Sequence, residues 1–444
     1  MTELVVRVAH EADDLVAAGA LTAEAYRADG LIDDGDGYVE DLADAPRRAQ
    51  GALLLLALES GLDGTDGASG LVGTVTLALA GSAYAEVARP GEAEIRMLAV
   101  DPAARRRGIA EALTRAAMVE AVGLGVRAVV LSTFESARGV HRLYERLGFT
   151  RVPDRDWADD DVELRAYAWQ VPRGPGARVE AATWTPREVR DVAGWRVGLS
   201  GGFTRRANSV LALVEPDDVA TSIDEVERIY GAAGLRPTFR VCAEARPVEL
   251  DAILQARGYR DVAHTVVMVR DLGGVLDALG SRDVGAGAAQ AARVAFVVGA
   301  AQTARVAFVV GDVPDDAWIS TWLAVKSVSS LARPSVGPTD RELAAAIVSG
   351  SRAVYARAVD AGTTVGVVRA ALVGEWVGLS CLMISRSARR RGVGSALTLE
   401  ALRVAADRGA TRAFLQVERT NRPAIALYEA LGFLPATQYH YRER

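Results

Sequence analysis

The chain has 444 residues, half of them hydrophobic, and a formal net charge of −6. This length exceeds a single ordinary core and predicts two or three domains of about 100–200 residues each. The negative charge gives no electrostatic case for nucleic acid or an anionic membrane as the main partner, although local arginine clusters allow an anionic cofactor. Cys242 and Cys381 stand in unrelated contexts, and the four histidines show no metal-ligand spacing. We therefore expect neither a disulfide framework nor a metal.

The first residues of the chain and its apolar runs indicate where in the cell the protein is expected. Glu3, Glu11, Asp13 and Asp14 make the first residues acidic, unlike a signal peptide. The longest aliphatic run, residues 52–58, is far short of the roughly 20 residues that a membrane helix needs. We expect a cytoplasmic protein, monomeric or homodimeric, that does not bind a membrane.

Hydrophobic periodicity predicts an alternation of strands and helices over the first 170 residues. Residues 4–9 alternate as a strand, and residues 13–26 have helical spacing. Residues 52–58 and 71–80 read as a hairpin with residues 61–70 as its loop. A strand over 94–100, a helix over 109–121, and strands over 128–133 and 162–169 follow, before a proline- and glycine-rich linker at 172–176.

The middle of the chain, residues 177–272, predicts a smaller α/β segment. Its pattern gives a strand at 209–214, a helix at 223–232, a strand at 237–242, a helix ending at 254–259 and a strand at 264–269. Two interpretations stay open: a degenerate half-copy of the unit that follows it, packed against that unit, or an unrelated α/β insert.

Residues 273–312 form a connector that contains a direct duplication. The sequences AQAARVAFVVG and AQTARVAFVVG agree at every position except where Ala291 faces Thr303. Two copies are too few for a solenoid, so a recent tandem duplication is the simpler origin. We expect one copy as a core strand and the other as a loop or an edge strand.

Residues 313–444 predict a second complete unit. Residues 316–327 and 341–349 look helical, residues 353–360 and 363–371 pair as a hairpin, and residues 376–384 form the next strand. A helix then runs from Gly392 toward Gly409, and the alternation of Tyr439 and Tyr441 suits an edge strand.

One motif occurs in both complete units. The strand near residue 100 leads into DPAARRRGIAEAL and the strand near residue 384 into SRSARRRGVGSAL, which share the pattern Arg-x-x-Gly-x-(Gly or Ala). A glycine-containing turn that opens a helix leaves backbone N–H groups unpaired, and the helix dipole and the arginines favour an anion there. The motif therefore predicts two cradles for a diphosphate.

A second motif follows each cradle at the same distance. The sequences LYERLGF and LYEALGF place Tyr144 and Tyr428 after apolar strands. From the first loop arginine to the tyrosine, 144 − 105 and 428 − 389 both give 39 residues. Matched motifs at equal spacing indicate that the same unit occurs twice.

On these residues the sequence resembles the GCN5-related N-acetyltransferase (GNAT) superfamily, and its two-unit plan is similar to that of mycothiol synthases and N-acetylglutamate synthase-like proteins. The resemblance implies an α/β fold: tandem GNAT domains at 1–171 and 313–444, each a mostly antiparallel mixed sheet flanked by helices. It also implies that the strand before each loop bulges, that backbone of this strand and the loop binds acetyl-CoA, and that no metal takes part. The cofactor residues carried over are Leu98, Ala99, Val100, Arg105, Arg106, Arg107, Gly108, Ile109 and Ala110, and Leu382, Met383, Ile384, Arg389, Arg390, Arg391, Gly392, Val393, Gly394 and Asn421.

Acetyl transfer to an amine needs a base for the amine and an acid for the departing thiolate. The resemblance makes Tyr428 the first candidate for the acid and Tyr144 the second, although either can instead be a packing residue. Glu418 and Glu94 are the candidate bases, against the alternative of solvated strand ends. Ala137 replaces the family's asparagine in the first unit, which weakens that site.

The sequence thus predicts an acetyl-CoA-dependent N-acetyltransferase that acetylates a primary amine of a small molecule by direct attack in a ternary complex. The C-terminal unit is the more complete site. The alternatives are an acetyl-CoA sensor or scaffold with one or both units inactive, and a protein N-acetyltransferase.

Overall fold

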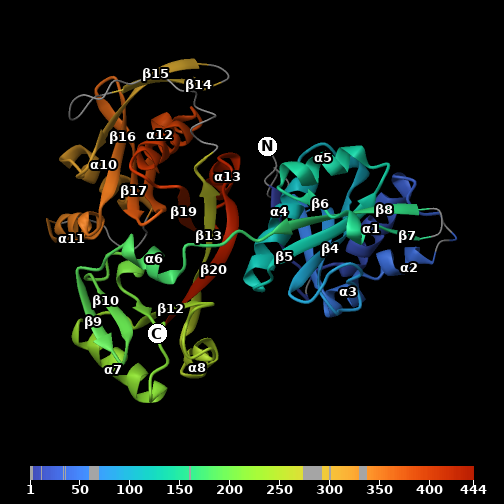
Figure 1. The fold of residues 1–444 in the computed structure, drawn as a ribbon, viewed down its shortest axis with the longest axis horizontal. Helices are drawn as coiled ribbons and strands as arrows, with labels where there is room; N and C mark the ends of the chain where they lie inside the picture. Colours follow the sequence, from blue (N-terminus) through green and yellow to red (C-terminus); the bar gives the residue numbers. More distant parts are fainter. Residues whose placement is uncertain are drawn as a thin grey trace. The chain divides into compact units, whose positions relative to one another are not determined.

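The computed structural model describes residues 4–273, 293–299, 302–329 and 338–444, apart from positions 12, 34, 36, 60–69, 160 and 161. Residues 61–69 of the predicted hairpin loop and the first residues of the duplicated segment, including Ala291, lie outside this range. The chain forms two compact units, Met1–Val171 and Pro172–Arg444 (Figure 1). No helix among the described residues is both long and apolar enough to cross a membrane.

The first unit is a mixed sheet with strand order β1-β2-β3-β4-β5-β8-β6 and β7 paired to β8. Only β4 and β5 run parallel within this order. Its strands are β1 (Leu4–Val8), β2 (Leu53–Glu59), β3 (Gly70–Leu79), β4 (Glu92–Val100), β5 (Ala128–Phe134), β6 (Thr150–Arg151), β7 (Trp157–Asp159) and β8 (Val162–Gln170). Its helices are α1 (Leu15–Ala28), α2 (Tyr38–Ala43), α3 (Ala45–Gly51), α4 (Ile109–Gly123) and α5 (Arg138–Arg146). The predicted mixed α/β class is confirmed.

The second unit is built on one 12-stranded sheet, ordered β14-β15-β16-β17-β18-β19-β13-β20-β12-β11-β10-β9. The middle of the chain supplies α6 (Ala177–Ala182), β9 (Glu188–Val192), β10 (Trp195–Leu199), β11 (Val210–Leu211), α7 (Val219–Ala232), β12 (Thr238–Cys242), α8 (Leu250–Ala256) and β13 (Arg260–Asp271). The rest supplies β14 (Arg293–Gly299), β15 (Gln302–Gly311), α10 (Asp316–Ser329), α11 (Pro338–Ser349), β16 (Ala353–Asp360), β17 (Thr363–Val373), β18 (Trp376–Ile384), α12 (Val393–Asp407), β19 (Arg412–Glu418), α13 (Arg422–Ala430) and β20 (Leu434–Glu443).

The final strand corrects one prediction. The alternation of Tyr439 and Tyr441 suggested an edge strand, but β20 pairs with β12 on one side and β13 on the other. Both tyrosines are buried. The neighbouring strands β12 and β13 belong to the middle segment, which is distant from β20 in sequence. Alternation alone does not reveal whether a strand has one partner or two.

Segments that are distant in sequence exchange strands in this unit. In the first unit β8 lies between β5 and β6, the strand that follows α5. In the second unit, β13 of the middle segment occupies the equivalent position between β19 and β20 of the C-terminal segment. In turn, β20 of the C-terminal segment occupies the equivalent position between β12 and β13 of the middle segment. Figure 1 shows β13 and β20 side by side. The middle segment also repeats the order strand, helix, parallel strand, helix, strand of the C-terminal segment.

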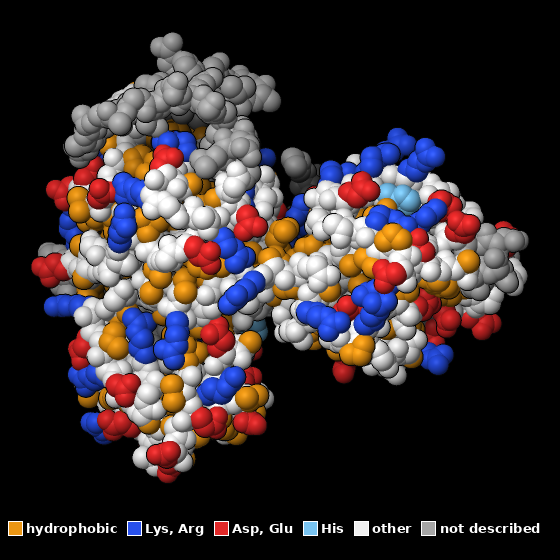
Figure 2. Space-filling view, in the orientation of Figure 1, with side chains coloured by type: hydrophobic (Ala, Val, Ile, Leu, Met, Phe, Trp, Pro, Cys, Tyr) orange, Lys and Arg blue, Asp and Glu red, His pale blue; other side chains and the backbone are white. Residues whose placement is uncertain are grey.

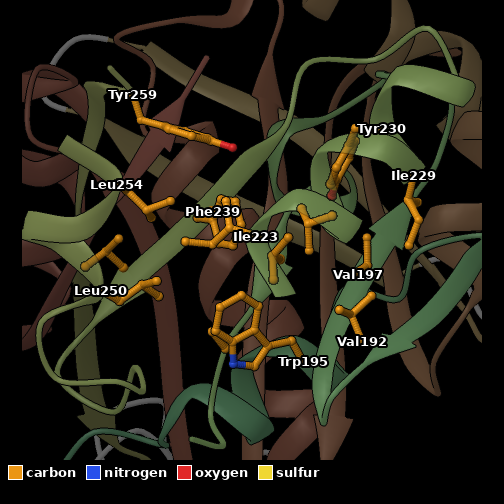
Figure 3. Packing of buried hydrophobic residues seen from close by; sticks show 14 of the residues in the cluster. Val192, Trp195, Val197, Ile223, Ile229, Tyr230, Phe239, Leu250, Leu254 and Tyr259 are labelled. Atoms are coloured by element: carbon orange, nitrogen blue, oxygen red, sulfur yellow. The ribbon is translucent and has the colours of Figure 1, made fainter. Parts of the chain in front are cut away.

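The middle segment has its own core. Trp195 meets the edge of Phe239 with ring centroids 5.8 Å apart, and Phe239 meets Tyr259 at 5.6 Å. Figure 3 shows these rings converging with aliphatic side chains of α7 and α8. Trp195 therefore packs in this core.

A buried arginine joins the two segments of the second unit. Arg369 on β17 donates to the carbonyl oxygens of Thr183 and Val348 at 2.8 and 2.7 Å, and to Ser351 at 2.7 Å. A fully buried guanidinium is costly unless its donors are satisfied, so these bonds hold the start of the middle segment on the C-terminal sheet.

Candidate active site

Each unit has a β-bulge in the strand before its arginine loop. The pairing of β3 with β4 shifts register between Thr74 and Thr76, and that of β17 with β18 shifts between Val367 and Arg369. The bulged residues Met97 and Cys381 have φ of 51° and 57°, an uncommon conformation for side chains with a Cβ. Each stands eight positions before the first loop arginine, so the two bulges are equivalent.

Beyond each bulge, two parallel strands separate. Pairing of β4 with β5 stops at Ile95 and Leu131, although both strands continue. Pairing of β18 with β19 stops at the equivalent Leu379 and Leu415. The second halves of β4 and β18 are thus paired on one edge only, and their other edge offers backbone donors and acceptors.

The residues predicted to contact the cofactor by backbone lie on these open halves. They are Leu98, Ala99 and Val100 on β4, and Leu382, Met383 and Ile384 on β18. An extended chain, such as a pantetheine arm, can pair with such an edge.

The loops that follow open α4 and α12 with glycine. Gly108 and Gly392 are the N-cap residues, with φ of 80° and 74°, and neither helix start has a side-chain cap. Among the described residues, no atom outside its immediate chain neighbours and its own helix backbone lies within 4 Å of a Cβ built on Gly108. The first-turn N–H groups, which have no side-chain cap, lie at the positive end of a 15-residue helix, where an anion is favoured.

The residues that follow Gly108 and Gly392 pack the start of each helix against its own unit. Ile109 and Val393 are buried, while Ala110 and Gly394 are half-buried. A Cβ on Gly394 would stand 3.6 Å from Ile384, so this glycine brings α12 close to β18.

The loop arginines divide by their contacts. Arg107 pairs with Glu59 at the end of β2, and Arg391 pairs with Asp360 at the end of β16 at 2.9 Å. Arg105 contacts Asp29 at 2.7 Å. These pairs fix the loop on its own unit.

The remaining arginines are more exposed. Arg389 donates to the carbonyl of Ile384 at 3.1 Å. The middle residues, Arg106 and Arg390, are exposed and adopt φ of 63° and 61°. On the face drawn in Figure 2, arginines and acidic residues intermingle over both units, so the cradles are local features.

The candidate acid tyrosines occupy matching positions on α5 and α13. Tyr144 packs on Phe149 with centroids 5.6 Å apart, and Tyr428 packs on Phe433 at 5.8 Å. Burial raises the pKa of both phenols, and the Cys381 thiol at the bulge raises that of Tyr428 further. Both groups are protonated at neutral pH, and Tyr428 lies near the bulge of its own site.

The asparagine and its replacement differ as expected from their side chains. Asn421 is the N-cap of α13, and its Oδ1 accepts from the N–H of Ala424 at 3.3 Å. Ala137 is the N-cap of α5 without a side-chain cap. The C-terminal helix is therefore better fixed at the end that follows the separated strands.

Glu418 ends β19, the strand that separates from β18. Its side chain is 56% exposed, with Arg205 at 4.0 Å. Arg205 also pairs with Glu443 at 3.2 Å, so a residue of the middle segment lies beside Glu418. The carboxylate remains open to a substrate amine.

Glu94 lies in a different environment. It is fully buried, and its Oε2 accepts from the N–H groups of Glu86, Val87 and Ala88 at 2.8–3.0 Å. Its Oε1 has no hydrogen-bond partner and stands 3.7 Å from Arg96. Burial raises the pKa of this carboxyl. Glu94 thus holds the turn before β4 as well as offering one unpaired oxygen.

One polar cluster beside the C-terminal site was missed from sequence. Gln416 on β19 donates to Glu180 on α6, and Glu180 pairs with Arg240 on β12 at 2.6 Å. The three residues come from three different elements that are far apart in sequence, so no local pattern marks them. Asn208 by contrast accepts from the N–H groups of Ser200 and Gly202 and is a turn residue.

Two protein families match the chain. The family described as "Acetyltransferase (GNAT) family" matches residues 22–149. The family described as "Probable histone acetyltransferase Rv0428c C-terminal" matches residues 177–443, which is more than half of the chain. The resemblance to GNAT proteins and the fold class are thereby confirmed.

The chain is also similar to individual curated proteins and solved structures. The uncharacterized N-acetyltransferase YobR of Bacillus subtilis is 22% identical over 265 residues, which are 60% of this chain and 96% of YobR. A mycothiol acetyltransferase of Nocardioides is 47% identical over 62 residues, 13% of this chain and 21% of that protein. A solved tandem GNAT protein from the clavulanic acid biosynthesis pathway covers 100% of this chain and 98% of its own, at 16% identity and a TM-score of 0.31.

Proposed function

Because this chain belongs to the GNAT acetyltransferases, and over residues 177–443 to the family described as "Probable histone acetyltransferase Rv0428c C-terminal", we propose that it acetylates a primary amine with acetyl-CoA. Acyl transfer is the activity of the family. The observation that carries the proposal is the doubled arrangement of a bulge, two separated strands and an uncapped glycine helix start.

Acetyl-CoA fits the chemistry of each cradle. The open edge of β18 offers backbone groups to the amides of the pantetheine arm, and the start of α12 offers N–H groups to the diphosphate. Arg390 would add charge-assisted bonds to phosphate oxygens. The same roles fall on β4, α4 and Arg106 in the first unit.

The C-terminal site is the proposed catalyst. Glu418 accepts a proton from the substrate ammonium, directly or through water, and the free amine attacks the thioester carbonyl carbon. A backbone N–H at the bulge stabilises the oxyanion that forms on the carbonyl oxygen. As the C–S bond breaks, Tyr428 gives its proton to the thiolate and is later reprotonated from solvent. The acetyl group passes directly to nitrogen without an acyl-enzyme, and the nitrogen loses its second proton to water as the amide forms.

The first unit keeps the cradle with fewer catalytic features. Tyr144 is present, but Ala137 provides no cap, and the candidate base Glu94 is enclosed by its own turn. A base with a raised pKa is well matched to neutral pH, yet an amine can reach Glu94 only if the turn at 86–88 moves. We propose that this unit binds acetyl-CoA and turns over slowly or not at all.

The acceptor is proposed to be a small-molecule amine, and the partial match to proteins named for mycothiol supports this class. The second candidate is an amine of a protein, which the histone acetyltransferase description of the matched family favours. Neither acceptor requires nucleic acid or a membrane. We place the reaction in the cytoplasm, with the enzyme as a monomer or a homodimer.

An acceptor panel tests the proposal. Purified protein is incubated with acetyl-CoA and either amino acids, amino sugars, polyamines or histone tail peptides, and CoA release is followed together with the mass of the acceptor. A gain of one acetyl group on a small amine supports the first candidate, and a gain on a peptide lysine supports the second. Binding of acetyl-CoA with no acetylated product from any class would favour the sensor or scaffold function.

A further inference from the structure

The exchanged strands bring together two histidines that are far apart in sequence. The pairing of β13 with β20 is irregular between Val262 and Thr265, and Ala263 in this bulge has φ of 55°. The bulge sets His264 beside His440 of β20, with nearly parallel rings whose centroids are 5.3 Å apart. Two of the four histidines of the chain therefore meet at one point of the sheet.

A carboxylate completes this group. Asp261, on the same strand as His264, has its Oδ1 at 3.0 Å from His264 Nε2. One donor atom each from Asp261, His264 and His440 can be chosen so that all three lie within 4.8 Å of one another. Binding of Zn²⁺ would require rotamer changes that place these atoms at the roughly 2.0–2.2 Å from the ion that nitrogen and oxygen ligands adopt.

The ring of His440 is oriented by a second carboxylate. Its Nε2 lies 2.7 Å from Asp251 Oδ1 on α8. Asp251 is in turn fixed by Arg442, which donates from Nε at 2.7 Å and from Nη2 at 2.9 Å. A carboxylate that accepts from one imidazole nitrogen orients the ring and makes the other nitrogen a better ligand, as is common around metal-binding histidines.

We propose that Asp261, His264 and His440 form a site for a divalent transition metal ion, with Zn²⁺ as the best match, and with water at the remaining position. Two imidazoles favour Zn²⁺ over Mg²⁺ or Ca²⁺, which prefer oxygen ligands. The His264 side chain is 51% exposed, so an ion can reach the site from solvent. This assignment is independent of the acetyltransferase site.

A bound ion would tie the middle segment to the C-terminal segment. His264 and Asp261 belong to β13, and His440 belongs to β20, so the ligands span the exchanged pair. Since a metal that binds only the folded protein stabilises it, Zn²⁺ should raise the thermal midpoint of the second unit.

The test is calorimetric titration of untagged, chelator-treated protein with ZnCl₂. We expect about one Zn²⁺ per chain for the wild type, and loss of this equivalent in His264→Ala and His440→Ala. The matched controls are His10→Ala and His141→Ala, which should keep it. The proposal is overturned if the wild type binds no Zn²⁺, or if the His264 and His440 variants bind as the wild type does.

Two further measurements test the proposal if a variant fails to fold. If His440→Ala fails to fold, Asp261→Asn and His264→Gln replace two exposed ligands with similar shapes and should each weaken Zn²⁺ binding at least tenfold. The Zn²⁺-dependent rise in the thermal midpoint should disappear in the same variants. A rise that persists in His264→Gln would place the metal elsewhere and refute the assignment.

Discussion

Removal of one hydroxyl group, in Tyr428→Phe, separates a catalytic role of this residue from a packing role. The ring of Tyr428 packs edge-on against Phe433, and the side chain is only 8% exposed. Phenylalanine keeps that packing and removes only the hydroxyl group. The free energy of unfolding should therefore change by less than about 1 kcal/mol.

The effect on turnover should be much larger. A positioned general acid contributes about 10²–10⁴-fold, which is roughly 3–5 kcal/mol of transition-state stabilisation. We expect kcat to fall at least about 100-fold while the Kd for acetyl-CoA stays within a factor of about three. Tyr144→Phe should have a smaller effect on the overall rate, because the first unit is not the proposed main catalyst.

Tyr230→Phe is the matched control. The Tyr230 hydroxyl donates to the carbonyl of Gly198 at 2.9 Å inside the core of the middle segment. Its loss leaves a buried acceptor unpaired and should lower the free energy of unfolding by about 1–3 kcal/mol, without changing kcat. The assay combines initial rates of CoA release with titration of acetyl-CoA and urea unfolding. A Tyr428→Phe protein that keeps its kcat, or loses cofactor affinity in proportion, would show that Tyr428 only packs.

Three other changes follow from the same site and its surroundings. Gly392→Val should weaken acetyl-CoA binding at the C-terminal site at least about 100-fold, since it blocks the backbone donors; Gly374→Val, at another glycine with a left-handed φ, should cost similar stability and leave affinity unchanged in the same titration. Glu418→Gln should lower kcat at least about tenfold at neutral pH and less at high pH, where the amine is already neutral; equal losses at both pH values in a rate profile would exclude the base role. The Arg442 guanidinium lowers the pKa of Asp251 from 3.8 to about 2, so the stability from this pair is complete above pH 3.8 and is lost as the pH falls toward 2. Because Asp251 is partly exposed, that loss should be about 1 kcal/mol in acid unfolding and absent in Asp251→Asn.

The repeated motif was predictable because it is local. Glycine at a helix start, arginines beside it and a tyrosine at fixed spacing are all visible within about 40 residues of sequence. The two bulges at Met97 and Cys381 were implied by resemblance alone, since neither residue type favours a positive φ.

The features that could not be predicted from the sequence depend on pairing between distant segments. The exchange of β13 and β20 joins segments with no shared local signal, and it turns an expected edge strand into a central one. The same exchange creates the contact of His264 with His440, although their spacing along the chain gives no metal pattern. Glu94 illustrates a further limit: its place on the strand suggested a base, while its burial depends on how the turn at 86–88 folds over it.

Calorimetric titration with acetyl-CoA tests the central claim most directly. It should be carried out on the wild type and on Gly108→Val and Gly392→Val. The account predicts two sites in the wild type, one lost in each variant, since both units carry an open strand edge and an uncapped glycine helix start. Wild-type protein that binds no acetyl-CoA, or variants that bind it unchanged, would contradict the assignment of these loops as cofactor cradles.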